Sequence, residues 1–579
     1  MPINRKEAAH AARQSAALLA SDRPHPKQLS NGDEQKYSGA NFAMSFTKGL
    51  EHDPDTGLVK NRDHFKAFRT AINDGYIDAF TNRVPVPSFP EGRRQWEAPT
   101  AGIVYDLEGP DAQSVTMAPA PALGSDELAF EMAEVYELAL LRDEPFHAFD
   151  SNGGSQALTD ARDRLRSYAY AQAGFPNRPR KTVNGQLDRE TLFRGSSTGV
   201  EVGPFVSQFM LIGNAVPNML DLTDGKIIYG AQTIDQRVPV AREGDDYMQD
   251  WASWRDVQDG RDVRAPGDLG QSFLPGQTRF IQTPRDLATY VHFDALYQAY
   301  LNACLILLGM GAPTDPGFAH LSGARGSYPS GNDVARAANA GGFALYGGPH
   351  ILTLVTEVAT RALKAARYQK FNNHLRLRPE ALAARLSTDH LPEAVFPQLG
   401  TAFSDMRSSV QPTVDAINAR NGNDDALLPM AFAEGSPMHP TYAAGHASVA
   451  GACVTILKAY FDTGALFVTD GSGATSFRHA EMGDTSIAYE AHQNGASLRP
   501  VAVSAPLTLE GELNKLAANI SIGRNMAGVH YFSDYYDSLR MGEEIAIGML
   551  EEQALCYPTD PFVMSVQTFD GNTVHIGAR

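Results

Sequence analysis

Cysteine is scarce in this chain, which has only three among 579 residues. Cys304, Cys453 and Cys556 are far apart and form no Cys-x-x-Cys pair. This spacing argues against a disulfide framework and against a cysteine-based zinc site. We therefore expect the three side chains to be buried free thiols.

Long apolar runs are also missing. No run reaches the roughly 18 residues that a membrane helix requires. The first 22 residues are rich in alanine, but Arg5, Lys6, His10 and Arg13 interrupt them, so they lack the apolar core of a signal peptide. We expect a cytoplasmic protein without a membrane partner, while export directed by a segment outside this chain stays open.

Positive charge is in short supply, with 49 Lys and Arg against 67 Asp and Glu and a net charge of −18. Such a balance argues against nucleic acid or an anionic membrane as the main partner, because both attract basic surfaces. Against this acidic background, a local cluster of basic side chains indicates a specific site and not the general charge of the surface. The apolar fraction of 43% is ample for a large core.

Helical periodicity dominates the recognisable segments, and it predicts a mainly α protein. The predicted helices are 126–143, 286–309, 349–377, 446–461 and 533–556. Gly, Pro, Asp and Ser are frequent in 190–280 and 311–347, which we expect to form long ordered loops or short strands, with a small hairpin at 226–240. A soft boundary near residue 270 divides one continuous unit into 1–270 and 271–579.

Two cations lie at the end of the predicted helix 349–377. Lys370 and Arg378 are eight residues apart, which is about 80° around a helix, so both could reach one anion. Pro379 marks the helix end, and Arg367 and Arg376 add charge. The alternative is a solvated basic face near a helix C-terminus.

A glycine–histidine turn precedes the next helix, in the sequence Ala443-Ala444-Gly445-His446. Gly445 allows backbone N–H groups to approach an anion, and a helix N-terminus favours negative charge. His446 would then lie against that anion. An ordinary turn into a buried helix is the alternative.

The third cluster contains Arg524 and His530, with Gly523 and Gly528 beside or between them. Six residues do not place two side chains on one helix face, so the glycines must fold this segment. Asp534 is four residues after His530, and its carboxylate could accept a hydrogen bond from one ring nitrogen. Together, the three clusters predict a pocket for a tetrahedral oxyanion, vanadate or phosphate, bonded to one histidine while the other transfers protons.

Lys-x7-Arg-Pro, a Gly-His turn and Arg-x5-His-x3-Asp resemble the signature of vanadium-dependent haloperoxidases and of the histidine acid phosphatases related to phosphatidic acid phosphatase. The segment 436–446 and the motif Asn31-Gly32-Asp33-Glu34 resemble the bromoperoxidases of red algae and their bacterial relatives. The resemblance therefore reaches both ends of the chain.

This resemblance implies a vanadate cofactor with His530 as the vanadium ligand and His446 as the acid–base residue. It further implies that Asp534 supports His530 and that the cofactor is bound by Lys370, Arg378, Gly445, His446, Arg524 and His530. Lys370 would also polarise peroxide. Arg367 and His439 match the algal bromoperoxidases and favour bromide.

One position departs from the family pattern, which has Pro-Ser-Gly-His where this chain has residues 443–446. Ala444 lacks the serine hydroxyl that would donate to an oxyanion oxygen. A hydrogen bond to a charged group contributes roughly 1.5–3 kcal/mol, so we expect weaker vanadate binding or altered activity with the fold retained.

The resemblance implies two four-helix bundles, with the site in the C-terminal one and oligomer contacts in 1–270. The implied enzyme is a bromoperoxidase that uses hydrogen peroxide and bromide, with iodide or chloride as further halides, and acts on a small organic substrate. A homo-oligomer built from dimers is implied, and some relatives bind structural calcium, for which we identify no acidic loop. Three alternatives stay open: an acid phosphatase with a phosphohistidine at His530, a non-halogenating vanadium enzyme, and an inactive scaffold.

Overall fold

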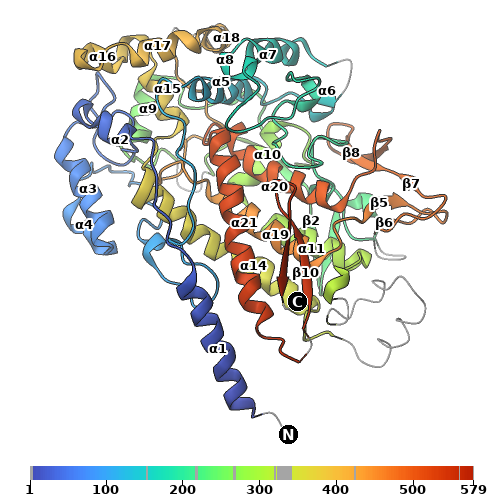
Figure 1. Cartoon of the computed structure of the whole chain (residues 1–579). Helices are drawn as coiled ribbons and strands as arrows, with labels where there is room; N and C mark the ends of the chain where they lie inside the picture. Colours follow the sequence, from blue (N-terminus) through green and yellow to red (C-terminus); the bar gives the residue numbers. More distant parts are fainter. Residues whose placement is uncertain are drawn as a thin grey trace.

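A computed structural model describes residues 4–150, 154–215, 220–264, 269–318, 321, 342–422, 425–559 and 561–577. The described chain is mainly helical, which confirms the predicted fold class (Figure 1). In the first half the helices are α1 (Arg5–Asp22), α2 (Asp33–Lys36), α3 (Arg62–Asp74), α4 (Ile77–Arg83), α5 (Asp126–Leu140), α6 (Phe146–Asp150), α7 (Gln156–Arg166), α8 (Ala169–Gln172) and α9 (Trp251–Gln258). In the second half they are α10 (Pro284–Phe293), α11 (Gln298–Met310), α14 (Gly348–Arg367), α15 (Pro379–Arg385), α16 (Pro392–Val395), α17 (Ala402–Ser409), α18 (Gln411–Asn421), α19 (Gly445–Tyr460), α20 (Leu509–Met526) and α21 (Phe532–Ala554).

Short antiparallel sheets fill the long segments between helices. The predicted hairpin exists as β1 (Lys226–Tyr229) paired with β2 (Gln232–Asp235). More strands are present than this one hairpin: β3 (Val238–Ala241) with β4 (Phe273–Arg279), β5 (Leu466–Thr469) between β6 (Thr475–Arg478) and β7 (Thr485–Ser486), β8 (Ala488–His492) with β9 (Ser497–Val501), and β10 (Val563–Gln567) with β11 (Thr573–Gly577). Most of the predicted loop 311–347 lies outside the described residues.

Two predicted helices are interrupted. The segment 286–309 is split into α10 and α11, which meet at an angle of 99° because Asp294 ends α10 in an extended conformation. The segment 349–377 is helical in α14 up to Arg367 and then continues as a wider π-helical turn, which Leu375 ends in the left-handed region at φ 42°. Lys370 and Arg378 are therefore not on one regular helix, and the predicted eight-residue helical spacing between them is wrong.

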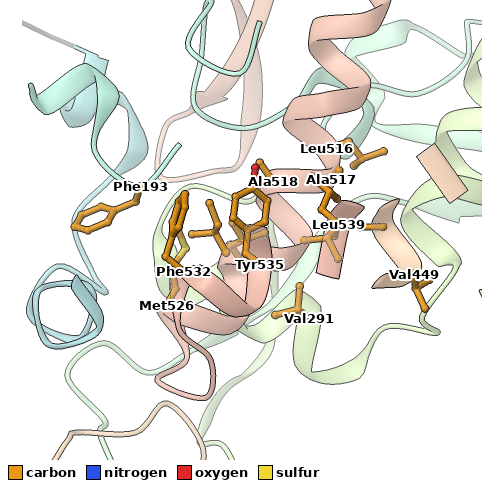
Figure 2. Packing of buried hydrophobic residues seen from close by; sticks show 14 of the residues in the cluster. Phe193, Val291, Val449, Leu516, Ala517, Ala518, Met526, Phe532, Tyr535 and Leu539 are labelled. Atoms are coloured by element: carbon orange, nitrogen blue, oxygen red, sulfur yellow. The ribbon is translucent and has the colours of Figure 1, made fainter. Parts of the chain in front are cut away.

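A four-helix bundle occupies the centre of the C-terminal half. Its helix α19 packs against α14, α20 and α21, and α21 also contacts α14 and α20. The buried side chains of Leu516, Ala517, Leu539 and Val449 meet where α19, α20 and α21 pack together (Figure 2). The helix α20 was not predicted, because most of its positions are buried and it therefore lacks the polar stripe that shows periodicity.

Most of the core in the described structure forms one cluster. One cluster of buried apolar side chains extends from Tyr37 to Ile576, and a smaller one surrounds α3 and α4. Cys304 and Cys453 are buried free thiols as predicted, but Cys556 is exposed near the end of α21. Within the described residues, no single helix is long and apolar enough to cross a membrane; the bent pair α10 and α11 passes on length and composition alone.

Glycine allows α19 and α21 to approach closely. A Cβ atom added to Gly451 would lie 1.9 Å from the carbonyl oxygen of Leu539, and one added to Gly542 would lie 2.0 Å from that of Ser448. Both distances are far below van der Waals contact, and both opposing atoms belong to helix backbone. The two helices can therefore keep this separation only with glycine at these positions.

We expect Gly451→Ala to lower the free energy of unfolding by at least about 1–3 kcal/mol, because overpacking forces two helix backbones apart. The midpoint of urea unfolding would measure this loss. Gly471→Ala is the matched control, since Gly471 is exposed and an added Cβ would meet no atom within 4 Å. Equal midpoints for the two variants would contradict the close-packing argument.

Candidate active site

His530 lies in the short turn between α20 and α21, and it is buried. Arg378 Nη1 donates to its Nε2 over 3.0 Å, and Asp534 Oδ2 lies 2.8 Å from its Nδ1. Because arginine can only donate, Nε2 carries the lone pair and Nδ1 carries the hydrogen. Burial and the neighbouring Arg378 hold the pKa of His530 well below its usual value, so the ring is neutral at pH 7.

Asp534 is fixed by several donors from different elements. It accepts from Arg376 Nη1 at 2.9 Å, from the backbone N–H of Tyr531 at 3.0 Å and from the Thr441 hydroxyl. Burial alone would raise the pKa of Asp534, but Arg376 and the bond from His530 hold it below its usual value. Arg376 also pairs with Glu131 of α5. From the sequence we expected its charge to add to the anion pocket, but the structure uses this charge to support Asp534.

Three buried cations belong to the site, and one of them, Arg378, contacts His530 Nε2 directly. Lys370 Nζ donates to the carbonyl of Thr441 at 2.9 Å, Arg378 Nη1 to that of Val529 at 2.8 Å, and Arg524 Nη1 to that of Val291 at 2.7 Å. None of the three is ion-paired to a carboxylate in the part of the chain that the structure describes.

Burial lowers the pKa of each of these cations. For Lys370 the shift is large, and the charges of Arg378 and Arg367 add to it. For Arg378 burial lowers the pKa to about 9, and for Arg524 the direction is the same. Buried like charges without acidic partners are costly, and an anion between them would remove that cost.

The predicted glycine–histidine turn forms the N-terminus of α19. Ala444 is the N-cap residue and has no side-chain capping bond, and Gly445 begins the helix. His446 Nε2 lies 3.0 Å from Asp294 Oδ1, an aspartate at the end of α10. Asp294 therefore fixes the ring and leaves Nδ1 as the nitrogen with the lone pair.

An arginine and a histidine form a second wall of the site. Arg367, at the last position of α14, has a buried Nε and Nη1 for which the described part of the chain supplies no hydrogen-bond acceptor. Arg378 Nη2 donates to His439 Nδ1 at 2.7 Å, so the 3.1 Å approach of that nitrogen to the Pro440 carbonyl is a contact only. Glu97 Oε2 lies 3.7 Å from Arg367 Nη2 and 3.3 Å from His439 Nε2.

These groups converge on one cavity of about 380 Å³. Of the predicted residues, its lining includes Arg367, His439, Gly445, His446, Arg524 and His530. Lys370, Arg378, Ala444 and Asp534 are buried behind this lining. Arg378 and Asp534 contact His530, Ala444 precedes Gly445, and Lys370 donates to the carbonyl of Thr441. The rest of the lining is mixed. Leu269, Val291, Leu296, Leu363 and Phe432 are apolar, whereas Arg94, Glu97, Arg264, His292, Asp294 and Glu434 are charged or polar.

Sequence reasoning missed three polar contacts of the site. Thr441 touches both His530 and Asp534, and it stands inside a segment whose flanking residues were singled out. Asp294 and Glu97 come from segments distant in sequence, and neither carries a local pattern. Only their position in the fold brings them to the site.

Comparisons of this chain with family models, with related sequences and with solved structures all point to the same family. Residues 413–555 match the family model described as the VCPO second helical-bundle domain. The chain is 41% identical to the vanadium-dependent bromoperoxidase of Corallina pilulifera, over 99% of this chain and 98% of that protein. It is 30% identical to the vanadium-dependent bromoperoxidase of Ascophyllum nodosum, over 95% and 88% of the two chains.

The chain belongs to the vanadium-dependent bromoperoxidase family. The solved structure of a second vanadate-dependent bromoperoxidase from Ascophyllum nodosum, a homohexamer, superposes with a TM-score of 0.77 at 25% identity and covers 99% of this chain and 91% of that one.

The residues of this bromoperoxidase fit a bound vanadate. Among the described residues, buried N–H groups of Arg367 and Arg524 find no acceptor, and Lys370 and Arg378 have no acidic partner. Such a set of donors suits a multiply charged oxyanion, and the lone pair of His530 Nε2 suits a metal bond. Calcium is a different matter: among the described residues, no group of three or more His, Cys, Asp or Glu could hold a metal ion.

Alanine at position 444 removes two hydrogen bonds that a serine could make, one that caps α19 and one to the oxyanion. A serine at an N-cap accepts from the backbone N–H groups of the first turn, and its hydroxyl hydrogen stays available for another acceptor. Alanine is among the weakest N-cap residues, whereas glycine is nearly as good as serine. Two substitutions at this position therefore separate the two effects.

We expect Ala444→Ser to tighten vanadate binding about 10- to 150-fold, the equivalent of roughly 1.5–3 kcal/mol, and to stabilise the metal-free protein by about 1 kcal/mol. Ala444→Gly should give most of the stability gain without the gain in affinity. Calorimetric titration with orthovanadate and thermal unfolding measure the two effects. A serine variant that binds vanadate no more tightly than the glycine variant would contradict the role of the hydroxyl.

Proposed function

We propose that this protein is a vanadate-dependent bromide peroxidase, oxidising bromide with hydrogen peroxide to hypobromous acid or an equivalent that brominates organic compounds. The observation that carries the proposal is a group of three buried cations that have no acidic partner among the described residues, one of which donates to the lone pair of a neutral histidine. The relatives named above support the same activity.

The chain's own residues would bind and orient the cofactor. His530 would bond vanadium through Nε2, while Lys370, Arg378 and Arg524 would neutralise the oxygens and the backbone N–H of Gly445 would donate to one of them. Arg378 now donates to Nε2, so binding would transfer that hydrogen bond to an oxygen. Bound vanadate supplies a pentavalent Lewis acid that activates hydrogen peroxide.

Proton transfer would fall to His446. Burial lowers the pKa of His446; Asp294 opposes the shift, and Arg524 adds to it. The ring is therefore neutral at pH 7, and its Nδ1 can accept a proton from hydrogen peroxide and later return it. Asp294, bonded to Nε2, would stabilise the charged ring in between.

Bromide is the proposed halide because Arg367 and His439 match the bromoperoxidase pattern. The apolar side chains in the cavity wall would contact a small organic substrate. Exclusion of water by the same side chains would strengthen the interaction of a halide with the cations.

A homo-oligomer is part of the proposal, supported by the homohexameric relative. The helix α1 has no buried residues and extends away from the body of the protein (Figure 1). A helix of this length is marginal on its own in water, so contact with another copy would stabilise it.

Bromide oxidation should depend on vanadate with saturation, measured with monochlorodimedone on metal-stripped protein titrated with orthovanadate. We expect His530→Ala to lower this activity by more than about 100-fold, because it removes the atom that would bond vanadium. Loss of a residue that only supports a metal ligand typically costs about 10- to 100-fold. His479→Ala is the control, since His479 is exposed and outside the cavity. Turnover of p-nitrophenyl phosphate without vanadate, together with no bromide oxidation, would instead favour the phosphatase alternative.

Deletion of residues 1–22 should reduce the mass of the oligomer and leave the fold of the protomer intact, because α1 contributes nothing to the core. Sedimentation velocity compares the two proteins, and circular dichroism checks the helical content. An unchanged sedimentation coefficient, apart from the lost mass, would contradict a role for α1 in assembly.

A further inference from the structure

Arg367 offers an anion site beside the oxyanion pocket. Its side chain is only 8% exposed, and its Nε and Nη1 have no acceptor within the described structure. An added Cβ at Gly445 would lie 3.9 Å from Nη1, which places this guanidinium next to the N-terminus of α19. Burial lowers the pKa of Arg367, and Glu97 opposes that shift. A small anion here would gain charge-assisted hydrogen bonds from a partly dry wall.

Glu97 faces the same wall from the opposite side. Its Oε2 lies between Arg367 Nη2, at 3.7 Å, and His439 Nε2, at 3.3 Å. The hydrogen on this histidine nitrogen points to Glu97, because Nδ1 already accepts from Arg378. One carboxylate oxygen thus engages the two groups that would otherwise donate to an anion.

The Glu97 carboxylate also lies near a second cation, Arg94. The side chain of Glu97 is 42% exposed, and its second oxygen lies 3.7 Å from Arg94 Nη2 on the same segment. An ion pair this exposed and this long contributes little stability. Rotation of Glu97 towards Arg94 would therefore free Arg367 and His439 at small cost.

We infer that Glu97 is an internal competitor of the halide: its carboxylate occupies the Arg367–His439 wall and must be displaced for bromide to bind there. This inference rests on the proposed function for the identity of the anion. It makes Glu97 a determinant of halide affinity, separate from the residues that bind the cofactor. Such competition disfavours weakly held anions, and it also limits occupancy of the wall when halide is dilute.

Halide binding can be measured without turnover. The excess line width of ³⁵Cl⁻ in solution, recorded with vanadate-free protein and reversed by added bromide, gives an apparent dissociation constant for bromide. We expect Glu97→Gln to tighten binding about three- to tenfold, as removal of one charge near 4 Å from a partly exposed cation should. Glu97→Asp keeps the charge on a shorter side chain and should give a smaller gain.

Two further variants make the result specific. Glu91→Gln removes the same charge from the same segment, but Glu91 pairs with Arg261 and does not line the cavity. It should leave bromide binding unchanged. On an Arg367→Ala background the gain from Glu97→Gln should disappear, because the competed group is gone. In the vanadate-loaded enzyme, Glu97→Gln should lower the KM for bromide in the same proportion, with little change in kcat.

Unchanged or weaker bromide binding in Glu97→Gln would overturn the inference, as would an equal gain in Glu91→Gln or a full gain without Arg367. The line-width measurement does not depend on peroxidase activity. Tighter binding in Glu97→Gln without any bromide oxidation would therefore support the competition and reject the proposed function. The converse result, oxidation without a Glu97 effect, would reject the competition alone.

Discussion

The uncompensated positive charge around His530 is the constraint on which the site depends. Lys370, Arg378 and Arg524 are almost fully buried, yet within the described chain their hydrogen bonds go to backbone carbonyls and to histidine, not to carboxylates. Buried cations arranged in this way repel one another and depress each other's pKa. The arrangement is stable only within a rigid fold, and an oxyanion would relieve it.

Rigidity comes from a second layer of buried ion pairs. Arg376 joins Asp534 to Glu131 of α5, and Lys48 pairs with Glu380 at the start of α15. These pairs tie residues of the first half of the chain to the segments that carry the site cations. The two halves suggested by the boundary near residue 270 are thus joined at the site, and that boundary stays a prediction. The close packing of α19 against α21, which Gly451 and Gly542 permit, fixes the two helices that begin close to His446 and His530.

Much of the site followed from sequence because its determinants are local. Asp534 is four residues after His530 at the start of a helix, and this spacing alone indicated a contact with one ring nitrogen, which the structure shows to be Nδ1. The glycine before His446 likewise indicated a helix N-terminus, which α19 confirms. The prediction failed where geometry depended on packing: the helical spacing of Lys370 and Arg378 was wrong, because a π-helical turn and the left-handed Leu375 come between them.

The parts that sequence did not show are those that adjust the site. Asp294 orients His446 from the end of a helix that was predicted to continue through this position. Glu97 reaches Arg367 from an irregular segment with no pattern of its own. Cations that attract an anion can be recognised from their spacing, because several must occur together. A single carboxylate that limits this attraction has no such signature, so only the folded structure shows how the charge of the site is balanced.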